Sequence, residues 1–242
     1  MHKVVRNDSP GSLLRKHQEW TTLLKTNNNL KEDWESVDKK IKEDVKIALK
    51  DMYKGCCCYC EGKVEPTSYL HIEHFKPKSR YKELCYDYNN LHYCCERCNI
   101  TKGTKYSTKM FSPTTHDPEQ FIKYIGETAT GKDTTGRGAY MIRILKLNER
   151  RDLKDERAKI LRGFEERISD ITDSLGIIVR NDYEKSNIDL ILPHIKRLIA
   201  NIEEHMQHGE SYCSMVKHNF CEQLKILEEI YKELEYKYTL YK

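Results

Sequence analysis

The sequence lacks several features that would place the chain in a special structural class. Among its 242 residues, glycine and proline are scarce, with 11 and 6, and no stretch approaches the roughly 20 apolar residues that a bilayer core demands. Basic and acidic residues nearly balance, 42 against 38, so the formal net charge is only +4. This composition, 38% hydrophobic and 33% charged, excludes a collagen-like, silk-like or strongly disordered chain. It allows one large packed domain or two small ones.

The first residues also lack the apolar core of a signal peptide, because they turn polar at once: Met1-His2-Lys3-Val4-Val5-Arg6-Asn7-Asp8. We therefore expect a cytoplasmic protein with no membrane partner.

Cysteine, in contrast, is clustered. The chain has 10 cysteines, and eight of them lie between Cys56 and Cys98. A disulfide framework would suit a short secreted chain, whereas clustered cysteines in a reducing compartment more often bind metal. The same stretch is basic: from Cys56 to Met110, nine Lys or Arg residues face six Asp or Glu residues. Most of the chain's excess positive charge therefore lies in the same segment as the clustered cysteines.

Two Cys-x-x-Cys pairs, Cys57/Cys60 and Cys95/Cys98, have the spacing of a zinc site. Two intervening residues let both thiolates of a pair point at one ion, and four thiolates close the tetrahedral shell of a structural Zn²⁺. Only 34 residues separate the pairs, so zinc would replace a core that this segment is too short to build. Three further cysteines adjoin the pairs and leave a shift of the ligands by one residue open: Cys56, Cys58 and Cys94. We expect the other three to pack as small apolar residues: Cys85, Cys213 and Cys221.

The residues between the pairs indicate chemistry. In His71-Ile72-Glu73-His74-Phe75, an extended strand would put Glu73 and His74 on opposite faces. Histidine is the natural general base near neutral pH, and a carboxylate is a hard ligand suited to Mg²⁺ or Mn²⁺. If Cys95 and Cys98 open a helix, Asn99 and Lys102 share its first face.

In this order the motifs resemble the HNH endonucleases: Cys57-x-x-Cys60, Glu73-His74, Asn90-Leu91 and Cys95-x-x-Cys98-Asn99-x-x-Lys102. The resemblance implies a zinc-stabilised ββα-metal, treble-clef-like module. It implies that His74 activates water, that Glu73 and Asn99 bind a catalytic Mg²⁺ or Mn²⁺, and that Asn90 holds the loop that orients His74. Asn99 departs from the family, which often has histidine there, and its oxygen is a weaker ligand than imidazole.

A narrower resemblance is to the PtuB-type nucleases of Septu and retron-linked anti-phage systems. It is carried by the following segments: Cys57-Cys58-Tyr59-Cys60-Glu61, Ile72-Glu73-His74-Phe75-Lys76-Pro77-Lys78-Ser79, Tyr86-Asp87-Tyr88-Asn89-Asn90-Leu91, Asp117-Pro118-Glu119 and Leu145-Lys146-Leu147-Asn148-Glu149-Arg150. This resemblance implies a nuclease restrained by a PtuA-like ATPase partner. We expect that partner at the helical arms, since Tyr231, Tyr236, Tyr238 and Tyr241 crowd one end of the chain.

Outside the cysteines the pattern is helical. Apolar residues recur at helical spacing from Leu13 to Leu24 and from Trp34 to Met52, where Gly55 is placed to end the helix. A short strand over 120–125 and a loop to Gly138 come before three further helices, and Pro193 suits the first turn of the second. We therefore predict an α+β, mainly α protein with three parts. These are an N-terminal helical arm (1–55), the HNH module (56–112) and a C-terminal helical region with a short β element (113–242).

Other interpretations remain open at this point. A non-catalytic zinc finger that binds nucleic acid or protein is the main alternative to a nuclease, and a structural subunit with an inactive site is a weaker one. His71 is expected to pack in the module, although ligation is an alternative. Four basic residues suit either a solvated loop or phosphate contacts, and we expect phosphate contacts: Lys76, Lys78, Arg80 and Lys82. We expect a phosphate contact of Lys102 as well.

One motif is a decoy. Gly126-Glu127-Thr128-Ala129-Thr130-Gly131-Lys132 mimics a phosphate-binding loop, but Asp133 stands where Ser or Thr would hold magnesium. We predict a hairpin there. Nothing in the sequence separates a DNA substrate from an RNA substrate.

Overall fold

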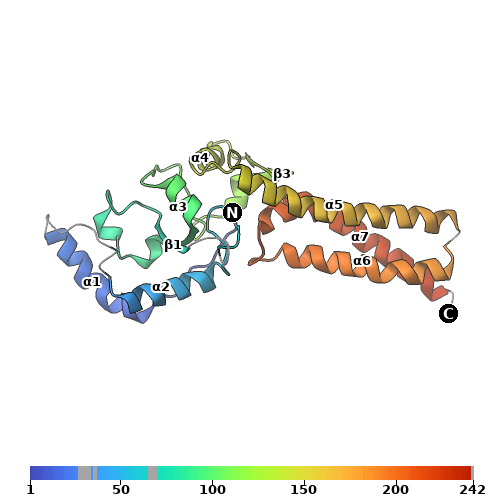
Figure 1. Cartoon of the computed structure of the whole chain (residues 1–242), viewed down its shortest axis with the longest axis horizontal. Coiled ribbons are helices and arrows are strands. Elements are labelled where there is room, and N and C mark those ends of the chain that lie inside the picture. The colour runs from blue at the N-terminus through green and yellow to red at the C-terminus, as the bar shows by residue number, and fades with distance from the viewer. Residues whose placement is uncertain (27–33, 35–36, 65–69, 182, 241–242) are drawn as a thin grey trace. The chain divides into compact units, whose positions relative to one another are not determined.

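The computed structural model describes residues 1–26, 34, 37–64, 70–181 and 183–240, and Figure 1 traces them. They form two compact units. The cysteine unit comprises residues 1–123, 129–149 and 208–212, and the helical unit comprises residues 124–128, 150–207 and 213–240. The protein is α+β and mostly helical, as predicted, with two small sheets. The three-part division expected from the sequence groups the chain differently, and its boundaries remain a prediction.

Two N-terminal helices belong to the cysteine unit: α1 (Gly11–Thr26) and α2 (Lys39–Met52). The apolar pattern predicted one helix from Trp34 onward, and this start is wrong. The helix begins at Lys39, because the carboxylate of Asp38 caps it by accepting from the Lys40 amide at 2.7 Å. Trp34 lies before the capping residue and is still buried, so the apolar spacing of α2 extends beyond the N-terminus of that helix. The Asn27–Asn29 break lies outside the described residues.

The end of α2 also differs by one residue from the prediction. Lys54, rather than Gly55, is the first left-handed residue, with φ of +50°, and Gly55 follows with φ of +74°. The Lys54 amide donates to the Asp51 carbonyl at 3.1 Å and the Gly55 amide to the Lys50 carbonyl at 2.9 Å. These two bonds are those of a Schellman motif, which satisfies carbonyls that the helix end leaves free. The chain then turns directly into the first Cys-x-x-Cys pair.

The centre of the cysteine unit is an antiparallel pair of strands followed by a short helix. Strand β1 (Leu70–His74) pairs with β2 (Leu91–Cys95) in a register that sets Leu70 opposite Cys95 and His74 opposite Leu91. Two 3-10 turns lie between the strands, η2 (Lys82–Leu84) and η3 (Tyr88–Asn90), and helix α3 (Glu96–Lys102) follows β2. All five residues of β2 are buried. The two strands and the helix occur in the order of a ββα module, and their metal binding remains a prediction.

The predicted strand over 120–125 begins at Ile122, after the 3-10 turn η4 (Pro118–Gln120). Strand β3 (Ile122–Ile125) pairs with β4 (Thr128–Gly131), which confirms a hairpin in place of a phosphate-binding loop. The hairpin prediction named no bounds for its second strand, and the helix α4 (Arg137–Ile144) was not expected, because the residues up to Gly138 were predicted to be a loop. Strand β4 alternates Thr128 and Thr130, which favour strands, with Ala129 and Gly131, which do not, so its local signal was too short and mixed to stand out from a loop.

The helical unit contains the three expected helices: α5 (Arg151–Arg180), α6 (Lys185–His205) and α7 (Cys213–Leu240). About half of the residues in their apolar stripes are buried and the others are partly exposed, and Phe164 of α5 meets Phe220 of α7 with ring centroids 5.3 Å apart. Pro193 was expected in the first turn of α6, but it lies inside that helix. Because proline has no amide hydrogen, the bond that residue 193 would donate to Asp189 is missing there. Among helices of the described residues, none combines the length and apolarity needed to cross a bilayer.

Candidate active site and zinc site

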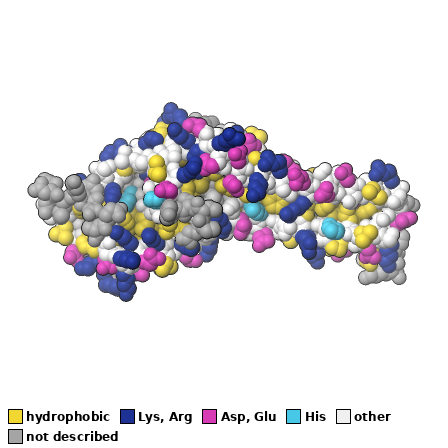
Figure 2. Space-filling view, in the orientation of Figure 1, with side chains coloured by type: hydrophobic (Ala, Val, Ile, Leu, Met, Phe, Trp, Pro, Cys, Tyr) yellow, Lys and Arg dark blue, Asp and Glu magenta, His cyan; other side chains and the backbone are white. Residues whose placement is uncertain are grey.

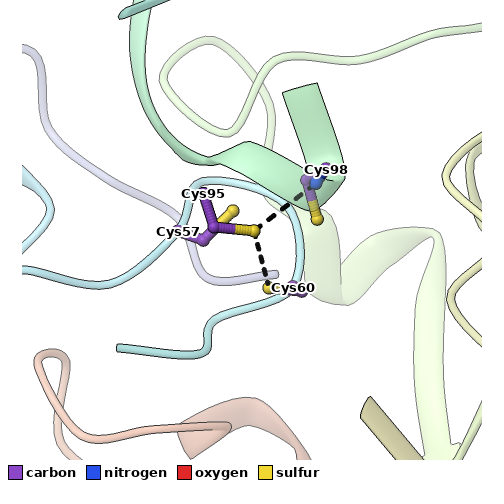
Figure 3. Close-up of side chains that lie close together, drawn as sticks. All are labelled: Cys57, Cys60, Cys95 and Cys98. Carbon is purple, nitrogen blue, oxygen red and sulfur yellow. Dashed lines mark hydrogen bonds between the residues drawn. The ribbon is translucent and has the colours of Figure 1, made fainter. Parts of the chain in front are cut away.

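Cys57, Cys60, Cys95 and Cys98 converge, as the two motifs predicted (Figure 3). Their sulfur atoms all lie within 4.8 Å of one another, and those of Cys60 and Cys95 are 3.9 Å apart. A tetrahedral zinc with bonds of about 2.3 Å separates its sulfur ligands by about 3.8 Å. All four side chains are buried. The cluster therefore fits Zn²⁺ in donor type, number and spacing.

The cysteines next to the cluster differ from one another. Cys58 and Cys94 are buried and form a group of three with Cys57, whose sulfur is 3.8 Å from that of Cys94. Cys56 instead donates its thiol hydrogen to the Gly209 carbonyl at 3.3 Å, and burial raises the pKa of Cys56 to about 12. Only the predicted set brings four ligands together within the described residues. Of the cysteines expected to pack, Cys85 and Cys213 are buried and Cys221 is exposed.

His74 is the last residue of β1, and its ring has a defined tautomer. Nε2 lies 2.9 Å from the Cys85 carbonyl oxygen. A carbonyl can only accept a hydrogen bond, so Nε2 carries the hydrogen and Nδ1 keeps its lone pair. Burial lowers the pKa of His74 to about 4, and the charges of Lys78 and Lys102 act in the same direction. At neutral pH the imidazole is therefore uncharged and able to accept a proton at Nδ1.

The loop between the strands is fixed by Asn90, which is buried in η3. Its side-chain oxygen accepts from the Lys76 amide at 2.8 Å, and its nitrogen donates to the carbonyls of Lys76 and Leu84 at 2.9 and 3.1 Å. Leu84 precedes the residue whose carbonyl holds His74. The side chain of Asn90 thus lies where a loop-holding residue is expected.

Glu73 and Lys102 form a buried ion pair that the sequence did not reveal. The Glu73 carboxylate is paired with the Lys102 ammonium and accepts from the Tyr59 hydroxyl at 3.3 Å. Lys102 also donates to the His74 carbonyl at 2.9 Å. Burial raises the pKa of Glu73 to about 7, although Lys102 opposes that shift.

The Glu73–Lys102 ion pair affects two predicted roles, phosphate contact by Lys102 and divalent-ion binding by Glu73. Lys102 is fully buried, so it does not lie at the surface where a phosphate contact belongs. Glu73 is only 3% exposed and joins no group of three or more His, Cys, Asp or Glu side chains within the described residues. Asn99 lies in α3 and is partly exposed. The Glu73 carboxylate is thus paired with Lys102 in this structure, and the binding of a divalent ion by Glu73 and Asn99 remains a prediction.

The remaining basic residues lie on the loop after β1. The Lys76 ammonium is 5.6 Å from the ring centroid of Tyr81 and 5.9 Å from that of Tyr106. Arg80 is exposed and donates to the carbonyls of Thr104 and Tyr106 at 3.0 and 3.3 Å. Lys78 is partly exposed, and its charge affects His74. These three side chains are therefore available to an anionic substrate near His74.

Two N-terminal side chains, Arg6 and Asn7, also hold the segment around Asn90, and no sequence motif pointed to them. Arg6 donates to the carbonyls of Leu91 and Asn89 at 2.8 and 3.1 Å, on either side of Asn90. Asn7 accepts from the Tyr88 hydroxyl at 2.7 Å. No spacing rule identifies such residues, because they precede the first periodic pattern and act over more than 80 positions.

Similarity to known proteins covers the residues that form this site. Residues 57–105 match the family model described as HNH endonuclease. The chain is 33% identical over 152 residues to the Septu protein PtuB of Bacillus thuringiensis, which covers 62% of this chain and 55% of that protein. It is 29% identical over 172 residues to the Septu protein PtuB of Bacillus mycoides (strain KBAB4), which covers 56% and 57%. The chain thus spans just over half the length of the curated relatives it matches. Its residues 57–105, which include the cysteine cluster and His74, are similar to the HNH endonucleases, and the chain is similar to Septu protein PtuB.

Proposed function

We propose that this chain is an HNH endonuclease that hydrolyses phosphodiester bonds of nucleic acid in a bacterial anti-phage defence system. The observation that carries the proposal is the fixed tautomer of His74, whose Nδ1 is unprotonated and whose ring lies within the electrostatic reach of the Lys78 ammonium. The similarity to Septu protein PtuB supports the defence role. A cytoplasmic location remains a prediction from the sequence.

In the proposed reaction, Nδ1 of His74 removes a proton from a water molecule, and the resulting hydroxide attacks phosphorus. The bond to the 3′-oxygen breaks as the new P–O bond forms, which leaves a 5′-phosphate and a 3′-hydroxyl once the leaving oxygen takes up a proton. Lys76, Lys78 and Arg80 would hold the phosphate charge. The Cys85 carbonyl keeps Nε2 protonated throughout, so Nδ1 alone accepts the proton.

Two metals belong to the proposal. A structural Zn²⁺ on Cys57, Cys60, Cys95 and Cys98 is supported by the geometry of the cluster. A catalytic Mg²⁺ or Mn²⁺ rests on the family resemblance, which names Glu73 and Asn99 as its ligands. Glu73 would become available to such an ion only after it separates from Lys102.

The test is the variant His74→Ala in the zinc-loaded chain, assayed on plasmid DNA and on RNA with Mg²⁺ or Mn²⁺. Loss of a general base costs about a hundredfold or more in rate. Zinc content and helicity should not change, and His17→Ala on α1 is the matched control. If His74→Ala cleaves as fast as the control, His74 is not the base. If the unmodified chain binds nucleic acid but never cleaves it, the non-catalytic zinc finger becomes the better account.

We also propose a PtuA-like ATPase as a partner of the helical unit. Figure 2 shows apolar side chains along the visible face of α5, α6 and α7. A groove of about 510 Å³ lies between α5 and α6, and at its edge Leu190 is 71% exposed. Of the tyrosines expected to dock, Tyr236 is 65% exposed, whereas Tyr238 lies near the Lys185 ammonium and Tyr241 is outside the described residues.

Size-exclusion chromatography with the product of the neighbouring gene tests this partner. Leu190→Asp and truncation after Leu224 should each weaken co-elution. Ile47→Asp, at a similarly exposed apolar residue of α2, should not. Equal co-elution of all forms would place the contact outside the helical unit.

A further inference from the structure

Beside His74, a row of aromatic rings runs from the core to the surface, and the proposed hydrolysis does not use it. Phe75 meets Tyr106 with centroids 5.7 Å apart, and Tyr106 meets Tyr81 at 5.4 Å, with ring planes near perpendicular at 81° and 80°. At the inner end, Phe75 lies 5.8 Å from the ring of His92, which is fully buried. At the outer end, Tyr81 and Tyr106 are both partly exposed.

The backbone around these rings is fixed at several points. Arg80, next to Tyr81, donates to the carbonyl of Tyr106 at 3.3 Å, so the two loops that carry the tyrosines are tied together. Asn90 holds both backbone groups of Lys76, the residue after Phe75. Rings fixed in this way lose little conformational entropy when a ligand packs on them.

The surroundings of the tyrosines are basic. Between Phe75 and Lys109 the sequence has eight Lys or Arg residues and three Asp or Glu residues. Lys76 lies over both tyrosine rings, and three further cations near them are exposed: Arg80, Lys105 and Lys109. Aromatic faces among cations suit a polyanion that also presents flat apolar rings, which is the chemistry of a nucleic-acid strand.

We propose that Tyr81 and Tyr106 bind an unpaired base while Lys76 and its neighbours bind the adjoining phosphates, so that the substrate is single-stranded at the cleavage site. In a duplex the flat faces of the bases are stacked on one another, so the tyrosine rings would find no exposed base face on which to stack. A single strand, of DNA or RNA, satisfies both the rings and the cations. This inference rests on the proposed nuclease function, because it specifies that enzyme's substrate.

Binding tests it without requiring cleavage. Full-length, zinc-loaded His74→Ala protein is titrated into labelled single-stranded DNA, single-stranded RNA and the blunt duplex of the same sequence, and fluorescence anisotropy gives Kd. Adding Tyr81→Leu or Tyr106→Leu should weaken single-strand binding about tenfold, the usual scale of one lost stacking contact. Duplex binding should stay within about twofold, because its phosphate contacts are unchanged.

Matched variants separate stacking from support of the loops. Tyr140→Leu is the control, since Tyr140 is another partly exposed tyrosine of the same unit with a cation near its ring, Arg143 at 5.6 Å. Tyr81→Trp and Tyr106→Phe keep an aromatic face and should bind a single strand as tightly as the parent. If a Leu variant loses folding stability, these two aromatic variants still decide the matter.

The inference is overturned if the Leu variants bind a single strand like the control, if they lose duplex binding equally, or if the aromatic variants fail as the Leu variants do. Such results leave the nuclease proposal intact when the unmodified protein still cleaves. Conversely, selective single-strand binding by a protein that cleaves nothing would support the tyrosine site and refute the nuclease.

Discussion

Asn90→Ala is the substitution for which the structure gives the most complete expectation. The Asn90 side chain is 5% exposed and makes three hydrogen bonds, one with the Lys76 amide and two with the carbonyls of Lys76 and Leu84. Alanine removes all three and leaves their partners partly buried. With a net contribution of about 1 kcal/mol for each bond, the free energy of unfolding should fall by about 3 kcal/mol.

The neighbouring Asn89 is the matched control. It is exposed, and its side-chain nitrogen makes one bond, to the Asp87 carboxylate at 3.2 Å. Asn89→Ala should lower the free energy of unfolding by about 0.5 kcal/mol or less. Denaturant unfolding of the zinc-loaded proteins measures both values. If the two variants are equally stable, the Asn90 bonds do not hold the loop.

Catalysis should respond more than stability alone predicts. Leu84, which Asn90 holds, precedes Cys85, whose carbonyl fixes the His74 tautomer. A loosened loop would let the ring leave its productive orientation, so kcat should fall at least about tenfold under conditions where Asn90→Ala is fully folded. Unchanged kcat in the folded variant would refute the positioning argument while leaving the stability argument in place.

Further predictions concern metal, charge and pH. Cys60→Ser or Cys98→Ser should lose zinc and unfold the cysteine unit, measured by metal analysis and circular dichroism, whereas Cys221→Ser, at an exposed cysteine, should keep both. Mild EDTA treatment should abolish cleavage but leave zinc bound, and Mg²⁺ or Mn²⁺ alone should restore activity; a requirement for added zinc would contradict a closed four-sulfur shell. Lys102→Met should lower the free energy of unfolding by leaving Glu73 buried without its partner. The loss should be less than the roughly 3–5 kcal/mol of an unpaired buried charge, because losing Lys102 raises the pKa of Glu73 further and the carboxyl is protonated at neutral pH; the double variant with Glu73→Gln should recover most of that loss. Burial lowers the pKa of His74 from 6.5 to about 4, so between these values the unfolded chain binds more protons and the free energy of unfolding falls as pH falls. In His74→Gln the urea midpoint of unfolding should depend less on pH between about 4 and 6.5. The same pH dependence as in the unmodified protein would contradict a buried neutral histidine.

Local patterns carried most of what the sequence could predict. The Cys-x-x-Cys spacing is a property of a single turn, and the helical stripes of α5, α6 and α7 repeat within one element, so both were predictable without tertiary knowledge. The start of α2 was misjudged because burial of Trp34 extends the stripe past the Asp38 cap. Pro193 was misplaced because packing of α6 outweighs the one hydrogen bond that proline removes.

The sequence identified most of the residues of the candidate site, but it did not predict how some of them contact one another. His74 and Asn90 form contacts consistent with the roles that the motif assigned, since those contacts lie within one loop between two adjacent strands. The pairing of Glu73 with Lys102 joins a strand to the end of a later helix, and that depends on how the two elements pack. The contact of Arg6 with Leu91 spans 85 positions and has no motif at all.

Helix α3 connects the four-cysteine cluster to His74, the proposed base. Cys95 caps the helix, with its sulfur accepting from the Cys98 amide at 3.5 Å, and Lys102 ends it by donating to the His74 carbonyl. Seven residues at about 1.5 Å each give a rod of about 10 Å, too short to bend and with a ligand-bearing first turn. We expect a rotation of the sulfur end to shift the backbone of the proposed base, since Lys102 at the other end of the helix donates to the His74 carbonyl. A zinc ion on the cysteines, which does not contact the substrate, would in this way influence how His74 is oriented for proton removal. Replacing zinc with a larger thiophilic ion would then be a way to change that orientation.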